Sequence, residues 1–138
     1  NQAFVAIRIT RDDILGYLYR FHEVAPADAK KPRVPDLQQA IRAGVWLRPA
    51  LTRLVRSGMV EQAAGGYALT AVGSEAGRNL VRSHRLWESY LCDKLGFCAA
   101  DVHKAAHQLE HFTDEALQER LSTATGDPHQ DPHQREIP

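Results

Sequence analysis

Cysteine and long apolar runs are scarce in this chain of 138 residues, and each scarcity excludes a class of protein. Two cysteines are too few for a disulfide framework, which favours a reducing compartment. No run of about 18 uncharged apolar residues is present, so we expect no membrane-spanning helix. A charged and then apolar leader with a small-residue cleavage site is also absent, and we therefore expect the chain to be cytoplasmic.

The sequence also lacks a net charge, but its two halves differ in sign. Residues 1–83 contain 12 Lys/Arg and 7 Asp/Glu, whereas residues 84–138 contain 5 and 10. Six of the seven histidines lie in the acidic half. A basic half suits contact with a polyanion, and an acidic half rich in imidazole suits a bound cation. The overall composition, 43% hydrophobic and 25% charged, is that of a globular chain and excludes a disordered or fibrous protein.

The first part of the chain follows the order of a winged helix-turn-helix. Apolar residues at helical spacing predict helices over about 10–23, 35–44 and 45–57, and a basic loop with three prolines separates the first two. Short strand-like runs at 59–62 and 67–70 flank a glycine-rich turn. Helix, turn, helix and then a hairpin is the order of that fold.

The rest of the chain is predicted to be helical, with helices over about 74–95, 100–112 and 114–124, the last capped by Thr113. The proline-containing tail after Gly126 cannot form a regular helix. The predicted fold class is therefore mainly α. A winged helix-turn-helix with a small β-hairpin wing over residues 1–73 is followed by an all-α domain over residues 74–138.

Four residues with metal-ligand side chains share one narrow face of the predicted helix at 100–112, namely His103, His107, Glu110 and His111. The preceding helix carries His84 and Glu88 one turn apart, and the short connection makes the two helices antiparallel neighbours. Imidazole and carboxylate groups that converge between helices favour a divalent transition metal. The alternative is that both faces are solvated polar surfaces.

Enzyme chemistry finds little support in the sequence. A zinc protease requires Glu directly after the first His of its motif, and here Lys104 follows His103. No other residues in the sequence suggest a nucleophile paired with a general base, so we expect that the chain is not an enzyme. Cys92 lies one turn beyond Glu88 and is more simply explained as a small core residue than as a ligand.

Three segments resemble one family of regulators, namely VRSHRLWESYL at 81–91, VHKAAHQLEH at 102–111 and DEALQERL at 114–121. They are similar to the diphtheria toxin repressor family of iron- or manganese-dependent transcriptional repressors. The closing GDPHQDPHQREIP is also similar to the end of that family's metal-binding and dimerisation domain. The resemblance covers essentially the whole chain, is strong over 74–138 and is weaker in the helix-turn-helix. It implies a homodimer, and the family's SH3-like domain is not part of this sequence.

The resemblance implies two neighbouring metal sites. One would use His84, Glu88 and His103, and the other would use His107, Glu110, His111 and Asp13 from the first helix. Asp13 has an alternative role as an acidic partner of the helix dipole in the first turn. By resemblance the metal is iron(II) or manganese. Position 107 is typically Cys or Glu in the family, so its His leaves zinc, nickel and cobalt open.

The resemblance to repressors also implies contact with double-stranded DNA, for which the predicted helix at 45–57 is poorly suited. Its tip is Val45-Trp46-Leu47, which offers no hydrogen-bonding side chain to base edges. Phosphate contacts would come from four arginines, namely Arg33, Arg48, Arg53 and Arg56. A solvated helix face is the alternative for these arginines, and Trp46 is either a buried staple or a contact for a protein partner. We therefore expect weak, salt-sensitive DNA binding with little sequence preference.

Two functions remain open from the sequence. The first is a metal-dependent transcriptional regulator that binds DNA as a dimer when it is loaded with metal. The alternative is a cytoplasmic metal-sensing domain of a metal-ion ABC transporter permease, with little or no specific DNA binding. The start at Asn1 rather than Met and the apolar opening Phe4-Val-Ala-Ile suit this alternative. The helices predicted from 74 to 124 also carry more large apolar residues than a lone pair of helices can bury, among them Leu80, Trp87, Tyr90, Leu91 and Leu95, which predicts a homodimer.

Overall fold

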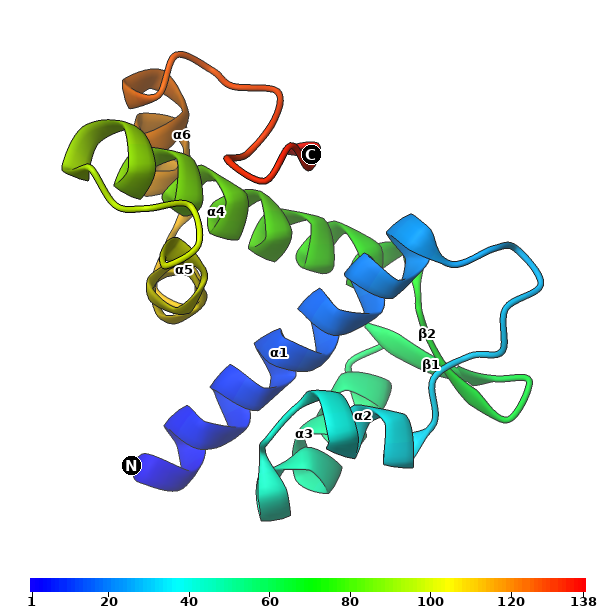
Figure 1. Ribbon diagram of the computed structural model, residues 1–138. Helices are drawn as coiled ribbons and strands as arrows, with labels where there is room; N and C mark the ends of the chain where they lie inside the picture. Colours follow the sequence, from blue (N-terminus) through cyan, green and yellow to red (C-terminus); the bar gives the residue numbers. More distant parts are fainter. The chain divides into compact units, whose positions relative to one another are not determined.

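The structure, a computed structural model, describes residues 1–138 and is mainly helical (Figure 1). Its chain forms two compact units, Asn1–Arg78 and Asn79–Pro138, and α4 contributes to both. The predicted fold class is confirmed. None of the helices combines the length and the apolar character that crossing a bilayer requires. The elements in order are α1 (Gln2–Val24), α2 (Val34–Ala40), η1 (Gly44–Trp46), α3 (Leu47–Arg56), β1 (Val60–Ala63), β2 (Gly66–Leu69), α4 (Ala71–Leu95), α5 (Val102–Glu110) and α6 (Glu115–Ala124).

Helix α1 begins at Gln2, so the predicted start near Thr10 is wrong. The side chain of Asn1 accepts a hydrogen bond from the Ala3 N–H at 2.9 Å and caps the helix. The Thr10 hydroxyl instead donates to the Ala6 carbonyl at 2.7 Å, as it does inside a helix. The apolar periodicity that marks this helix is carried by Ile14 and Leu18, both fully buried.

The remaining elements of the first unit complete the winged helix-turn-helix. Helices α1 and α3 pack together, and α2 and α3 contribute buried leucines to the core, namely Leu37, Leu47 and Leu54. Strands β1 and β2 form an antiparallel hairpin in which Val60 pairs with Leu69. The turn residues Ala64 and Gly65 both have positive φ, as the two-residue hairpin turn that matches strand twist requires.

Gly73 allows α4 to start directly against the turn before β1. A Cβ at this position would lie 1.8 Å from the Met59 carbonyl oxygen, so only glycine fits without a backbone shift. The hydroxyl of Thr70 accepts a hydrogen bond from the Gly73 N–H and donates one to the Gly58 carbonyl. These contacts end the wing and begin the long helix that leads into the second unit.

The second unit is a group of three helices closed by the C-terminal tail. Its buried core is formed by Leu86, Leu121 and Ile137, against which Trp87 and Tyr90 pack. Helix α6 is capped by the residue after the predicted one, because the Asp114 side chain accepts a hydrogen bond from the Leu117 N–H at 2.8 Å. The hydroxyl of Thr113 accepts instead from the Trp87 indole N–H at 2.7 Å, which joins α4 to the connection after α5.

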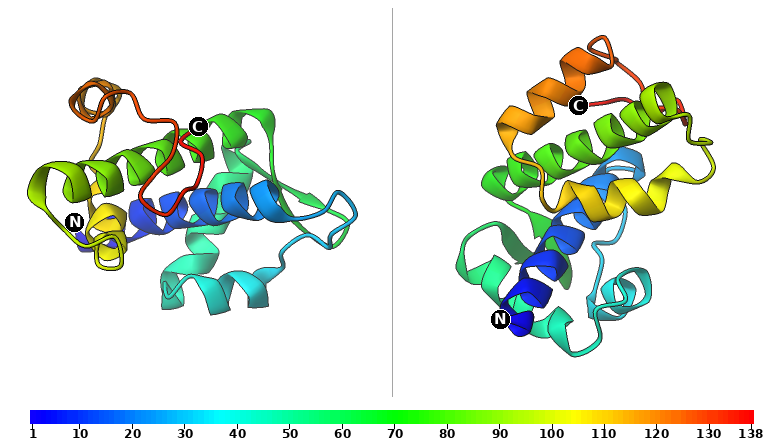
Figure 2. Two further views of the ribbon diagram at one scale, coloured as in Figure 1. Left: turned by 45° about the horizontal axis from the view of Figure 1, so that its top comes forward. Right: turned by 90° about the vertical axis from the view of Figure 1, so that its left-hand side faces the viewer.

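The tail contains no helix, as predicted, but it is firmly attached to the unit. Gln130 and Glu136 form an isolated antiparallel bridge, so the tail turns back on itself. Arg85 on α4 donates to the Glu136 carbonyl at 2.7 Å, and Ile137 enters the core. Figure 2 shows this segment, coloured red, returning alongside α4. The tail therefore brings its polar residues back to the helix that carries His84 and Glu88.

The large apolar residues that predict a homodimer differ from one another in exposure. Leu91 is buried within the chain, and Trp87 and Tyr90 pack against the chain's own core. Leu95, Phe97 and Phe112 keep large exposed surfaces. Of the five residues on which the predicted homodimer rests, Leu95 is therefore exposed and Leu91 is buried, and the homodimer stays a prediction.

Candidate metal centre

The site is built first on α4, where His84 and Glu88 occupy the same face one turn apart. The exposed fractions of the two residues are 1% and 0%, which is unusual for ionisable side chains. His84 Nε2 lies 3.1 Å from Glu88 Oε1. Charged groups are buried only when a partner or a bound cation compensates for the lost hydration. Helical spacing in the sequence placed His84 and Glu88 on one face of the helix. In the structure this face lies in the polar interior of the second unit.

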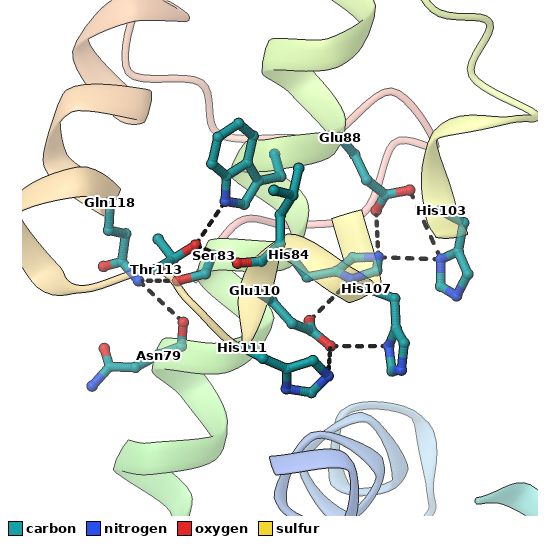
Figure 3. Close-up of polar contacts among 12 residues, drawn as sticks. Asn79, Ser83, His84, Glu88, His103, His107, Glu110, His111, Thr113 and Gln118 are labelled. Atoms are coloured by element: carbon teal, nitrogen blue, oxygen red, sulfur yellow. Dashed lines mark hydrogen bonds and ion pairs between the residues drawn. The ribbon is translucent and has the colours of Figure 1, made fainter. Parts of the chain in front are cut away.

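Helix α5 supplies the facing groups, and His84 contacts them with both of its ring nitrogens (Figure 3). Its Nδ1–H donates to Glu110 Oε2 at 3.0 Å, because a carboxylate can only accept. Its Nε2 lies 3.1 Å from His103 Nδ1, and the two ring centroids are 4.7 Å apart. Each end of the His84 ring therefore faces a different cluster of candidate ligands.

The first cluster consists of His84, Glu88 and His103, whose ligand atoms lie within 4.8 Å of one another. With Nδ1 protonated toward Glu110, the Nε2 of a neutral His84 presents a lone pair. This lone pair faces a carboxylate oxygen and the second imidazole nitrogen. A proton satisfies only one of these contacts, whereas a metal ion bonded to all three atoms satisfies the whole group. The donor set therefore fits a divalent metal ion.

The second cluster consists of His107, Glu110 and His111 at the end of α5. Glu110 Oε1 lies 3.0 Å from His107 Nδ1 and 3.9 Å from His111 Nε2. Glu110 and His111 are buried, whereas His107 is half-exposed. One carboxylate thus contacts the second cluster with one oxygen and His84 of the first cluster with the other. Asp13, the remaining predicted ligand, lies half-buried on α1 in the first unit, and its role in a metal site stays a prediction.

A third cluster, formed by Glu88, Asp131 and His133, was missed in the sequence. His133 Nε2–H donates to the Ala99 carbonyl at 2.7 Å, so its Nδ1, 3.1 Å from Glu88 Oε2, is the free nitrogen of the neutral ring. Asp131 Oδ1 accepts backbone N–H bonds from His133 and Arg135, while its Oδ2 is buried without a hydrogen-bond partner. The repeated Asp-Pro-His-Gln was the only signal in the sequence. Helical periodicity cannot place a residue of the tail against α4.

Both carboxylate oxygens of Glu88 are buried without a hydrogen bond to compensate for their lost hydration. They lie within ion-pair range of imidazole nitrogens, but none of these contacts has the geometry of a hydrogen bond. A fully buried carboxylate in this condition is costly unless a positive charge is bound beside it. Glu88 belongs to both the first and the third cluster, so it is the group most dependent on a metal ion.

The pKa values of His84 and Glu88 reflect this coupling. Burial disfavours the charged imidazole, but the contacts with the Glu110 and Glu88 carboxylates outweigh it and raise the pKa of His84 above its ordinary value. Burial likewise disfavours the charged carboxylate, but the contacts with His84 outweigh it and lower the pKa of Glu88. Each member of the pair therefore stabilises the charged form of the other.

A second layer of polar contacts holds the helices that carry the clusters. The Gln118 side-chain amide donates to the Ser83 hydroxyl at 2.8 Å and to the Asn79 carbonyl at 3.1 Å. Arg82 Nε donates to the side-chain oxygen Oε1 of Gln118 at 3.0 Å. Figure 3 shows the Gln118 contacts with Ser83 and Asn79. These bonds attach α6 to the segment of α4 that precedes His84.

The two cysteines take no part in these clusters. Cys92 and Cys98 are free, and the first is half-buried. Burial raises the pKa of the Cys92 thiol and so disfavours the thiolate that a metal would require. The structure agrees with the interpretation of Cys92 as a packing residue rather than a ligand.

The residues expected to contact DNA lie on the surface of the first unit. Arg33, Arg48, Arg53 and Arg56 are all exposed, and Arg53 and Arg56 lie in the last turn of α3, where a positive charge also stabilises the helix dipole. At the other end of the helix, Val45 is 79% exposed and Trp46 is half-buried. DNA contact by these arginines therefore stays a prediction.

Known proteins are similar to this chain both in sequence and in structure. Residues 70–138 match the family described as "Iron dependent repressor, metal binding and dimerisation domain". Among solved structures, a manganese-dependent transcriptional repressor in complex with manganese superposes with a TM-score of 0.81 at 31% identity. It matches over 93% of this chain and 58% of its own.

Two curated relatives belong to different classes of protein, since one is a membrane protein of metal transport and the other is a repressor. The probable metal transport system membrane protein of Chlamydia trachomatis is 44% identical over 94 residues, which is 68% of this chain and 21% of that protein. The iron-dependent repressor IdeR of Mycobacterium leprae is 25% identical over 123 residues, which is 88% of this chain and 54% of that protein. The chain therefore spans about a fifth of the chlamydial relative's length and about half of the mycobacterial one's.

Proposed function

Because the chain belongs to the iron-dependent repressor family, we propose that it is a metal-sensing regulatory domain that acts with a metal-transport membrane protein at its cytoplasmic face. The observation that carries this proposal is the 44% identity to a chlamydial metal transport membrane protein, against 25% to a mycobacterial repressor. The family is one of repressors rather than enzymes, and the expectation of no enzyme activity is confirmed.

The sensing site in this proposal is the pair of clusters between α4 and α5. His84, Glu88 and His103 would hold one divalent ion, and His107, Glu110 and His111 would contribute to a second. The support is their mutual approach within 4.8 Å and the burial of the two carboxylates. The bound metal would supply a positive charge beside these two buried carboxylates.

Metal would act as a signal by fixing α4 and α5 in one arrangement. Only α4 continues into the first unit, so the position of α4 is the feature that both units share. A homodimer is part of the proposal, because the matched family domain is described as a dimerisation domain and Leu95, Phe97 and Phe112 remain exposed on this unit. Sedimentation that detects only a 15.4 kDa species at micromolar concentration, with and without metal, would contradict it.

The coding sequence upstream of Asn1 tests the link to a transporter. A continuous reading frame that encodes several hundred residues with apolar spans supports the proposal, and a start codon directly before Asn1 contradicts it. If the frame continues, metal uptake should be compared between cells with the intact protein and cells with a His84→Ala/Glu110→Gln variant. Regulation by this domain predicts that uptake loses its dependence on external metal in the variant.

A metal-dependent repressor that binds DNA is the second candidate. It is favoured by the similarity to the manganese-dependent repressor over 93% of the chain and by the exposed arginines of α3. Selection from random duplexes with excess manganese, iron(II) or zinc distinguishes the two functions. A palindromic consensus bound at nanomolar affinity near physiological salt establishes this second candidate. Weak binding without a preferred sequence favours the transporter-associated domain.

A further inference from the structure

We propose that the helix-turn-helix of this chain docks an acidic protein segment of the metal-transport partner, in which apolar side chains lie on both sides of a carboxylate. This inference rests on the proposed function, since it names the surface through which the domain reaches that partner. The surface consists of two grooves in the first unit, one at the turn between α2 and α3 and one between α3 and the wing (Figure 1).

The first groove, at the turn between α2 and α3, is largely apolar. It has a volume of about 510 Å³. Two of its lining residues, Ile41 and Leu47, are almost completely buried, whereas a third, Val45, is 79% exposed. Covering such surface with another apolar group is favourable, because it removes apolar area from water. This groove therefore suits a large apolar side chain of a partner.

The second groove follows α3 on the side that faces the wing. It has a volume of about 310 Å³, and its lining includes Leu51 and Val55 of α3 and Tyr67 of β2. Val55 is 38% exposed. Arg48 lines both grooves, so the two adjoin at this side chain. One continuous segment can therefore fill both grooves with apolar side chains while it passes Arg48.

The charges around the two grooves define the chemistry of that segment. Their lining contains three arginines, Arg42, Arg48 and Arg56, and no aspartate or glutamate. None of the three forms an ion pair within the chain. Arginine binds carboxylates through two parallel hydrogen bonds, and arginine is enriched at the centres of protein interfaces. The complementary segment is therefore acidic, with its central carboxylate beside Arg48.

DNA is a less suitable occupant of this surface, although phosphates would also pair with the arginines. In the major groove, the thymine methyl is the main apolar group that the base edges present, so DNA offers little to fill two apolar grooves. The turn of the wing, Ala63-Ala64-Gly65-Gly66, carries no positive charge for a phosphate. The apolar grooves thus favour a protein segment where the charge alone does not distinguish the two.

Selection of random peptides displayed on phage against the immobilised full chain tests the chemistry of the occupant. We expect enriched peptides to carry Asp or Glu between large apolar residues. Binding of an enriched peptide, measured by fluorescence anisotropy, should weaken at least about tenfold in Val45→Glu and about fivefold in Arg48→Ala. The matched controls are Val72→Glu, at a valine that is 62% exposed on α4, and Arg120→Ala, at an exposed arginine of α6. Each control should change the affinity by less than about twofold.

Three results would overturn the docking surface. The first is the absence of an acidic and apolar consensus among the selected peptides. The second is equal binding of an enriched peptide to Val45→Glu and Val72→Glu. The third is a palindromic duplex, selected by the unaltered chain, whose binding is lost in Val45→Glu, because this surface would then be the DNA-binding one.

Metal uptake in cells separates this inference from the proposed function. We expect Val45→Glu to abolish the dependence of uptake on external metal while calorimetry shows an unchanged affinity of the variant for manganese and zinc. Loss of this dependence in His84→Ala/Glu110→Gln, but not in Val45→Glu, would overturn the docking surface alone. Unchanged dependence in both variants would overturn the proposed metal-sensing function as well.

Discussion

The charged side chains described above for the two units differ in their burial. In residues 79–138, His84, Glu88 and Glu110 are buried and contact one another, whereas in residues 1–78 the arginines of α3, Arg48 among them, are exposed and spread along one helix. Burying an ionised carboxylate costs several kcal/mol unless a cation compensates, so such an arrangement persists only where it has a partner. An exposed arginine costs almost nothing, and its presence alone indicates no particular function. The buried charges of the second unit therefore say more about function than the exposed arginines of α3.

Removal of one buried charge is the strongest test of this contrast. We expect Glu88→Gln to weaken metal binding by roughly 100-fold or more, because the amide keeps the shape but lacks the charge that two clusters share. Asp93→Asn, an exposed position on the same helix, is the control with an equal change of charge. Calorimetric titration of both variants measures the effect. Equal affinities for the two variants would remove Glu88 from the ligand set.

The tail provides a matched pair of histidines for the next test. His129 and His133 occupy the same position in successive Asp-Pro-His-Gln segments, but only His133 contacts Glu88. We expect His133→Gln to weaken metal binding by about tenfold, as loss of a supporting or auxiliary ligand does, and His129→Gln to leave it unchanged. Titration of the two single variants with the same metal compares them directly. An equal effect of both substitutions would exclude the third cluster as a separate contributor.

The metal-free chain should also respond to pH through the buried pair. The pKa of His84 is raised, so the stability from its charge is fully present below the ordinary value of 6.5 and is lost as the pH rises through the raised value. The pKa of Glu88 is lowered, so its contribution is present above 4.5 and is lost as the pH falls through the lowered value. We expect the Tm of metal-free protein to be highest between these titrations and to fall by a few degrees at alkaline pH.

Thermal unfolding in the presence of a chelator, followed over a pH series, measures this dependence. Saturating metal should abolish the alkaline fall, since the ion replaces the proton beside Glu88 and its affinity rises as the histidines deprotonate. A Tm of the metal-free protein that increases steadily from about pH 6 to about pH 9 would contradict the assigned sign of the His84 shift.

Substitution of the exposed arginines of α3 should have the smallest effects on stability and on binding. We expect Arg48→Ala and Arg53→Ala each to change the free energy of unfolding by less than about 0.5 kcal/mol, because neither side chain is buried. Any weak DNA binding should lose about one unit of salt slope per phosphate contact removed. Chemical denaturation and binding at several salt concentrations measure the two quantities. A loss of more than about 2 kcal/mol in stability would show that the first unit depends on a charge network comparable to that of the second.

The local parts of the fold were predictable because they depend on neighbours in the sequence. Helical periodicity located α3 and α4, and the order of helices and hairpin identified the winged helix-turn-helix. The same periodicity placed His103, His107 and Glu110 on one face of α5, and the structure brings that face against His84. Element ends were less predictable. The start of α1 depends on the Asn1 cap, and the cap of α6 depends on Asp114 rather than Thr113.

What the sequence by itself determined was the pair of histidine- and glutamate-bearing faces, because an α-helix repeats every 3.6 residues whatever surrounds it. Only the tertiary structure decided that Glu88 is completely buried, that one nitrogen of His84 is committed to Glu110, and that Asp131 and His133 return from the tail to α4. Such contacts join residues that are far apart in the chain. Their geometry depends on how the tail and the helices pack, which no local pattern encodes.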